Sequence, residues 1–423
     1  MIFDVCIIGG GASGMAAAVT AAGQGCKVLI LEKMDRLGRK ILATGNGRCN
    51  LSNNRIIRGS SAADQGYHCS DPHFPGKVIA SFDSKDALVF FGDLGIITAS
   101  RGEYIYPASM QASTVRNSLE WAVCGQKNIT VETGAAVRSS RYFPGDERAF
   151  VTETDDGRKF FSRKLIISCG GRSTPKLGSD GSGYGLCEGF GHHIVPVVPA
   201  LSALRCSDRF FRKLAGVRTQ AKVTLYVNGR ENAHDTGELQ LTSYGISGIP
   251  VFQLSRCAAY ALENGDKAEA ALDLVPDKSS RWLAQFIEKA SAQHPAYSMS
   301  MILSGILNST LAEVLTDLVH GDRTAPADSW DRGSILSLVS LIKSLRVNIS
   351  ASNGFDNSQV SAGGVDTAQI DPSTLSSLIV PGLYITGEVL DVDGICGGYN
   401  LQWAWATGYL AGRSAGRIKN DQN

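Results

Sequence analysis

Two short apolar runs frame a stretch of small residues at the start of the chain. Residues 4–8 read DVCII and residues 28–32 read VLILE, as expected of strands that are buried on both faces. Between them lie Met15 and three alanines, which are good helix formers. The pattern predicts a strand, a helix and a second strand. Similar alternation continues to about residue 190, with another buried strand at residues 164–168, and is typical of an α/β fold.

The pattern changes from about residue 192. Residues 218–228 alternate polar and apolar side chains and turn at Asn228-Gly229, which predicts a β-hairpin, and residues 238–242 continue as a strand. Apolar residues at helical spacing predict three helices, at residues 282–294, 303–320 and 334–346. The polar segment 322–331, interrupted by Pro326, is expected to be a linker.

An α/β pattern with many glycines returns from about residue 348. Residues 383–386 predict a strand, residues 387–400 a long loop, and residues 401–412 a helix. We therefore expect a discontinuous α/β domain, residues 1–191 and 348–423, with a β-strand and helical domain inserted at residues 192–347. Such an insertion costs little closure entropy.

Composition excludes several classes of function. The 423 residues carry a formal net charge of +1, which gives no electrostatic reason to expect nucleic acid or an anionic membrane as a partner. No apolar run approaches the roughly 20 residues of a membrane span, and the chain begins with a core strand, so we expect a cytoplasmic protein. The ten cysteines form no CxxC pair and the seven histidines no metal pattern, so no metal is expected.

A G-x-G-x-x-G turn, formed by Gly9, Gly11 and Gly14, joins the first predicted strand to the helix. In a dinucleotide-binding unit the first glycine allows the tight turn, the second lets the backbone approach the pyrophosphate, and the third lets helix and strand pack closely. Glu32, at the end of the next strand, is placed to accept hydrogen bonds from a ribose. Its charge favours FAD or NAD(H) over NADP(H).

Residues 37–50, LGRKILATGNGRCN, form a second glycine-rich motif. Its backbone can lie against a planar ring, Asn46 and Asn50 can bond ring heteroatoms, and Arg39, Lys40 and Arg48 can neutralise phosphate or a reduced flavin. The alternative is a charged helix face that ends in a glycine cap.

Two further glycine-rich segments follow predicted strands, at residues 169–185 and 382–408. In the first, Gly170-Gly171 allows close approach of a ligand, although an ordinary surface loop is the alternative. In the second, the N–H groups that open the helix near Leu401 can stabilise an electron-rich group such as a reduced flavin. Trp403 and Trp405 are expected to pack in the core.

The chain resembles the family of FAD-dependent oxidoreductases that includes aminoacetone oxidase-like enzymes and bile-acid-inducible flavoprotein reductases. The matching segments are GGGASGMAAA, GRKILATGNGRCNLSN, GSDGSGYG, GELQLTSYGISG and GEVLDVDGICGGYNLQWAWATG. The resemblance implies a glutathione-reductase-type FAD-binding Rossmann domain, interrupted by an insert made of a β-barrel and helices. The chain departs from relatives at Ser243, where they usually carry His, and at Cys169, where they tend to carry Thr.

The resemblance also implies the residues that hold FAD. They are Gly11, Ser13, Gly14, Glu32, Lys33, Arg39, Gly45, Asn46, Gly47, Arg48, Gly171, Glu388, Asp393, Gly394, Gly398, Asn400 and the backbone at Val137. The motifs add their neighbours Gly9, Ala12, Lys40, Cys49, Asn50, Gly170, Gly387, Tyr399 and Leu401.

Three functions are compatible with these motifs. The leading hypothesis is a reductase of an activated C=C bond of an unsaturated ketone, steroid-like or bile-acid-like, in which a transient NAD(P)H is the electron donor. Candidates for the proton donor are Tyr104, Tyr106, Tyr399 and Arg101. The alternative is an oxidase of a small amine that uses oxygen, and the third hypothesis is a non-catalytic flavoprotein. All but the last predict a small-molecule substrate, and the oligomeric state stays open.

Overall fold

The computed structural model describes residues 1–61 and 65–417, which divide into two compact units. The first unit combines residues 1–197 with the segment that starts at residue 359, and the second is residues 198–358. The sequence placed the return to the first unit at residue 348. That position lies inside strand β17 (Leu345–Ser352), which belongs to the second unit because it pairs with two barrel strands.

A seven-stranded sheet forms the centre of the first unit. Its strands, in the order of pairing, are β7 (Ile129–Thr133), β2 (Val28–Glu32), β1 (Ile2–Ile8), β10 (Lys159–Ile167), β9 (Phe150–Thr154) and β8 (Val137–Tyr142), with β19 (Leu383–Ile385) also on β10. Strands β7, β2, β1, β10 and β19 are parallel, whereas β9 pairs antiparallel with both β10 and β8. All five residues of β2 are buried, as its uninterrupted apolar pattern predicted.

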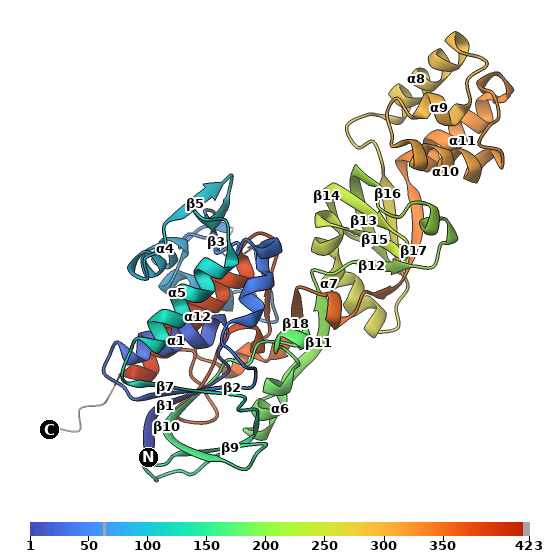
Figure 1. Cartoon of the computed structure of the whole chain (residues 1–423). Helices are drawn as coiled ribbons and strands as arrows, with labels where there is room; N and C mark the ends of the chain where they lie inside the picture. The colour runs from blue at the N-terminus through green and yellow to red at the C-terminus, as the bar shows by residue number, and fades with distance from the viewer. Residues whose placement is uncertain (62–64, 418–423) are drawn as a thin grey trace. The chain divides into compact units, whose positions relative to one another are not determined.

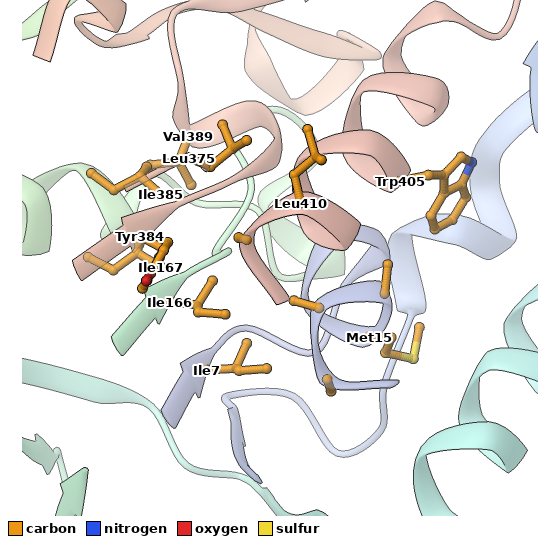
Figure 2. Packing of buried hydrophobic residues seen from close by; sticks show 14 of the residues in the cluster. Ile7, Met15, Ile166, Ile167, Leu375, Tyr384, Ile385, Val389, Trp405 and Leu410 are labelled. Carbon is orange, nitrogen blue, oxygen red and sulfur yellow. The ribbon is translucent and has the colours of Figure 1, made fainter. Parts of the chain in front are cut away.

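Helix α1 (Ala12–Ala22) packs against α12 (Tyr399–Gly416), and this contact joins the two ends of the chain (Figure 1). The helices approach closely through glycines: a Cβ atom on Gly408 would lie 2.2 Å from the carbonyl oxygen of Ser13. Figure 2 shows the core beneath them, where Ile7 and Ile166 from the sheet lie near Leu410 and Met15 from the helices.

The remaining elements of the first unit surround this core. The other helices described in this unit are α3 (Phe74–Ser81), α4 (Ser84–Asp93), α5 (Ala112–Cys124) and α6 (Ser182–Gly189). Strands β3 (Ser52–Asn53), β6 (Tyr104–Pro107) and β5 (Thr98–Arg101) form a small antiparallel sheet, and β4 (Tyr67–Cys69) pairs with β20 (Val392–Gly394). A further two-stranded sheet contains β11 (Ile194–Ala200) and β18 (Val360–Val365).

The second unit contains a closed antiparallel barrel, which confirms the expected insert. Its strands are β12 (Leu204–Cys206), β15 (Gly245–Gly248), β14 (Arg230–Thr242), β13 (Arg218–Val227), β16 (Ala268–Asp273) and β17. The predicted hairpin is confirmed: β13 and β14 pair across Asn228-Gly229, and both turn residues have positive φ.

Five helices complete the second unit. They are α7 (Ile249–Glu263), α8 (Ser280–Gln293), α9 (Met299–Leu303), α10 (Ser309–His320) and α11 (Arg332–Lys343). Helices α8 to α11 gather beyond the barrel strands, as Figure 1 shows. Two predicted boundaries were wrong. The single helix expected at residues 303–320 is interrupted because Asn308 caps α10, and the helix expected to reach residue 346 ends at Lys343 because Leu345 starts β17.

Among the helices that the structure describes, none is long and apolar enough to cross a membrane.

Candidate functional site

The carboxyl ends of β1, β2, β10 and β19 border a pocket within the first unit. Gly9, Glu32, Ser168 and Gly387, at or just after these strand ends, all line it. Helix α1 follows β1 on one side, and β2 and β10 flank β1, so the pocket lies where an open α/β sheet binds ligands. The pocket opens to solvent, and its empty space, including solvent at the opening, is about 1230 Å³.

The three glycines of the first turn have the geometry that the fingerprint predicts. Gly9 has φ +103°, and a Cβ atom there would lie 2.5 Å from the carbonyl oxygen of Ser168. On Gly14, a Cβ atom would lie 2.0 Å from the carbonyl oxygen of Gly9. By contrast, no atom lies within 4 Å of the Cβ position of Gly11, which faces the pocket at the start of α1. Gly9 and Gly14 therefore close the turn, and Gly11 leaves space for a ligand.

The Glu32 carboxylate also lines the pocket, next to the glycine turn, and is fixed by two backbone groups. Its Oε2 accepts a hydrogen bond from Gly10 N at 2.7 Å, and its Oε1 accepts one from Met34 N at 2.8 Å. Each carboxylate oxygen has a second lone pair, so the group can still accept hydrogen bonds from a ribose.

Two ion pairs involve cations that the sequence assigned to the cofactor. Lys33 Nζ lies 2.6 Å from Asp180 Oδ1, and Lys40 Nζ lies 2.8 Å from Glu388 Oε2. Burial opposes the charge of Asp180, but hydrogen bonds from Lys33 and from Ser182 outweigh it and lower its pKa. The Lys40–Glu388 pair links the two ends of the chain across the pocket wall.

The loop at residues 37–50 contributes to the pocket with its first half only. Gly38, Arg39, Lys40, Ile41 and Thr44 line it. The predicted ligands in the second half, Gly45, Asn46, Gly47, Arg48, Cys49 and Asn50, do not. Gly45 to Gly47 all have left-handed backbone and are exposed, and for Asn46, which is not a glycine, this conformation is strained, as tends to occur at functional sites.

Cys49 and Asn50, at the end of this loop, contact the protein interior and the neighbouring backbone. Cys49 is fully buried, and burial raises the pKa of its thiol to about 12. The Asn50 amide, oriented to satisfy its neighbours, donates to the carbonyl oxygens of Ser52 and Ile105 and accepts from Gly398 N at 3.2 Å. Asn50 therefore fixes the start of α12.

The C-terminal loop is folded tightly around its glycines. A Cβ atom on Gly398 would lie 2.4 Å from the carbonyl oxygen of Ser52. The Asn400 amide bonds both backbone groups of Gly394, at 2.7 and 2.8 Å. Asn400 and Leu401 line the pocket, as do Ala12, Ser13, Val137, Gly170, Gly387 and Glu388, whereas Gly14, Gly171, Asp393, Gly394, Gly398 and Tyr399 do not.

The candidate proton donors occupy two different environments. Tyr399 is 3% exposed, its ring meets Tyr67 edge-on at 5.4 Å, and its carbonyl oxygen accepts the Tyr67 hydroxyl. Arg101 and Tyr104 lie opposite each other on β5 and β6, and Tyr106 lies two positions further along β6. None of the four lines the pocket.

Several lining residues were not among the cofactor ligands predicted from the sequence. They include Met34, Arg36, Thr44, Ala135, Ser168, Cys169, Ser179, Gln359, Val360 and Trp403. Ala135 follows β7, and its N–H donates to the carbonyl oxygen of Glu32, so only the pairing of β7 with β2 reveals it. Burial raises the pKa of the Cys169 thiol to about 12, which keeps it protonated at neutral pH. No group of acidic, His and Cys side chains among the described residues is arranged to hold a metal ion.

These features fit the ADP half of a dinucleotide. The free space over Gly11 at the start of α1 suits a pyrophosphate, because backbone N–H groups at a helix N-terminus bind anions. The Glu32 carboxylate, held in place from both sides, suits a ribose.

Comparison with known proteins supports this assignment. The HI0933-like protein Rossmann domain matches residues 3–414. A 3-dehydro-bile acid delta(4,6)-reductase of Clostridium scindens is 44% identical over 97% of this chain and 98% of its own length. A ribosomal RNA dihydrouridine synthase of Escherichia coli is 31% identical over 96% of both chains.

The fold also matches a solved structure. The crystal structure of 3-ketosteroid delta1-dehydrogenase from Sterolibacterium denitrificans covers 98% of this chain and 99% of its own, with 13% identity and a TM-score of 0.51. Together, the comparisons confirm the expected fold, the cofactor FAD and the class of enzyme, an FAD-dependent oxidoreductase.

Proposed function

The chain belongs to the HI0933-like family of Rossmann-domain proteins, and on this basis we propose that it reduces a C=C bond conjugated to a carbonyl group, with reduced nicotinamide as the electron donor. The substrate we propose is a small unsaturated ketone of steroid or bile-acid type. FAD supplies hydride when it is bound.

One observation carries this proposal: two relatives with unrelated substrates are named for the same kind of change. The Clostridium scindens relative is named a delta(4,6)-reductase of a 3-dehydro-bile acid, and the Escherichia coli relative a dihydrouridine synthase. A 3-keto steroid with unsaturation at C4 and a uracil ring both have a C=C bond next to a carbonyl carbon. Reduction of each needs hydride at the far carbon and a proton at the near one.

The charge of the second unit favours the small molecule over RNA. Residues 198–358 contain 16 Lys and Arg and 16 Asp and Glu, so the unit has no net positive charge. RNA binding depends on neutralising phosphates with cationic side chains. The higher identity to the bile-acid reductase, 44% against 31%, points in the same direction.

Different residues of the first unit bind different parts of FAD. The N–H groups at the start of α1, exposed by Gly11, hold the pyrophosphate, and Glu32 holds the adenosine ribose. The Lys40–Glu388 ion pair fixes the part of the pocket wall between these two sites and the site of the flavin. We assign the flavin end to the two glycine-rich loops, residues 45–48 and 397–400, as the resemblance implies.

Anaerobic flavin spectroscopy tests this function against the amine oxidase alternative. We expect the flavin of the purified holoenzyme to bleach with NADH or NADPH and to regain its absorbance when 3-oxo-4-cholenoic acid is added. Bleaching by aminoacetone, with no response to either nicotinamide, would overturn the reductase in favour of the oxidase. Reoxidation by a uridine-containing RNA and not by the steroid would change the substrate class.

A further inference from the structure

The small sheet of β3, β6 and β5 presents one row of polar side chains on a single face. Tyr104 pairs directly with Asn53 on one side and with Arg101 on the other. Residues directly opposite in an antiparallel sheet share a face, and so do residues two apart on one strand, so Tyr106 belongs to this face too. Ile105, which points to the other face, is 1% exposed and packs in the core.

Both glycine-rich loops assigned to the flavin border this face. A Cβ atom on Gly397 would lie 2.8 Å from Tyr104 Cε1, so the ring lies directly on the loop backbone. Asn53 Nδ2 donates to the carbonyl oxygen of Gly397 at 2.9 Å. On the other loop, the Cβ position of Gly45 lies 3.8 Å from Tyr106 Cε1. The face is therefore the surface of the first unit that both loops share.

Tyr104 combines exposure with a protonated hydroxyl. Its side chain is 38% exposed, whereas Tyr399 is almost completely buried. Partial burial, together with Cys396, Tyr106 and Glu103 nearby, raises the pKa of Tyr104 above its ordinary value. The phenol therefore keeps its proton at neutral pH, as a proton donor must. The Arg101 side chain, across from Tyr104 on β5, is exposed, and its positive charge is available for an oxyanion.

We propose that this face contacts the substrate and that Tyr104 donates the proton that completes reduction of the C=C bond. The inference rests on the proposed function. The carbon far from the carbonyl accepts hydride, the enolate carbon next to the carbonyl takes the proton of Tyr104 Oη, and water restores that proton. The two electrons come from the reduced nicotinamide, which is oxidised as the C=C bond becomes a single bond. Arg101 stabilises the enolate oxygen.

The test separates the two half-reactions in Tyr104→Phe, with Tyr142→Phe as the matched control. Tyr142 lies on β8, against Phe150, and its loss removes a phenol hydroxyl away from the site. For Tyr104→Phe we expect unchanged FAD content, unchanged flavin reduction by NAD(P)H, and reoxidation by 3-oxo-4-cholenoic acid slower by about 10²-fold or more. Tyr142→Phe should match the wild type in all three.

A binding measurement adds a readout that does not depend on turnover. The steroid's Kd for the oxidised holoenzyme, followed by the shift of the flavin spectrum, should change less than about threefold in Tyr104→Phe and rise in Arg101→Gln, because only the arginine holds the ground-state carbonyl. Normal reoxidation of Tyr104→Phe, or a loss found in Tyr106→Phe instead, overturns the assignment of Tyr104. If the wild-type enzyme is not reoxidised by any enone, the proposed function fails and this inference with it.

Discussion

An added methyl group should weaken FAD binding at Gly11 but protein stability at Gly14, although the two glycines are only three residues apart. At Gly14 the new Cβ would lie 2.0 Å from the carbonyl oxygen of Gly9 and 2.7 Å from Ser168 Oγ, so helix and strand must separate whether or not FAD is bound. At Gly11 the new Cβ meets no protein atom within 4 Å. It enters only the space that we assign to the pyrophosphate.

The magnitudes follow from overpacking. A methyl group forced into a filled space costs about 1–3 kcal/mol, which corresponds to a rise of about 5- to 150-fold in the Kd for FAD of Gly11→Ala. The free energy of unfolding of its apoprotein should change by less than about 1 kcal/mol. Loss of chain entropy in the unfolded state stabilises Ala at the ordinary φ of −81°, and Ala is a poorer helix N-cap than Gly, so the two effects nearly cancel.

Gly14→Ala should instead destabilise the apoprotein by about 3 kcal/mol, which lowers Tm by about 6 °C or more. Thermal denaturation of both apoproteins and fluorescence titration with FAD provide the assay. A Gly11→Ala protein that binds FAD as tightly as the wild type refutes the placement of the pyrophosphate. A Gly14→Ala apoprotein of normal Tm refutes the packing argument.

Three further changes test other parts of the structure. Glu32→Gln should weaken FAD binding by about 1.5–3 kcal/mol, because a charge-assisted hydrogen bond to the ribose is lost; FAD titration measures it, and an unchanged Kd would remove Glu32 from the site. Lys40→Met leaves the Glu388 carboxylate without its cation at 2.8 Å and should lower the free energy of unfolding by about 1–2 kcal/mol in urea, whereas the double variant with Glu388→Gln should recover part of the loss. Burial opposes the charge of Asp83, but hydrogen bonds from Arg58 and from the first turn of α4 outweigh it and lower its pKa below its ordinary value. This stabilisation is complete above the unfolded pKa and is lost as the pH falls through the folded one. Asp83→Asn should therefore flatten the decline of Tm below about pH 4, and an unchanged decline would assign acid sensitivity to other carboxylates.

The local part of the site was predictable because its signals are adjacent in sequence. The strand, the glycine turn and Glu32 lie within 32 residues, and the spacing of the three glycines predicts the steric role of each. Ala135 and Gln359 line the same pocket, although they are more than 100 residues away from the glycine turn in sequence. Pairing between distant segments brings them there, and no local sequence pattern predicts such pairing.

The wrong helix boundary at residues 334–346 comes from pairing between distant segments. Residues 334–346 show helical spacing throughout, yet Leu345 and Arg346 pair with β16 because the barrel needs a closing strand. Tertiary pairing overrides local preference there. Likewise, Tyr104, Tyr106 and Tyr399 look equivalent in sequence, and only the sheet register and burial of Tyr399 separate them.

The most direct test of the central claim is a single anaerobic turnover of reduced holoenzyme with 3-oxo-4-cholenoic acid, followed by mass spectrometry of the steroid. We predict full return of flavin absorbance and one equivalent of a product two hydrogens heavier, which keeps its 3-ketone and has lost its C=C bond. A flavin that stays reduced, or a product in which the ketone has become an alcohol and the C=C bond persists, would contradict the account.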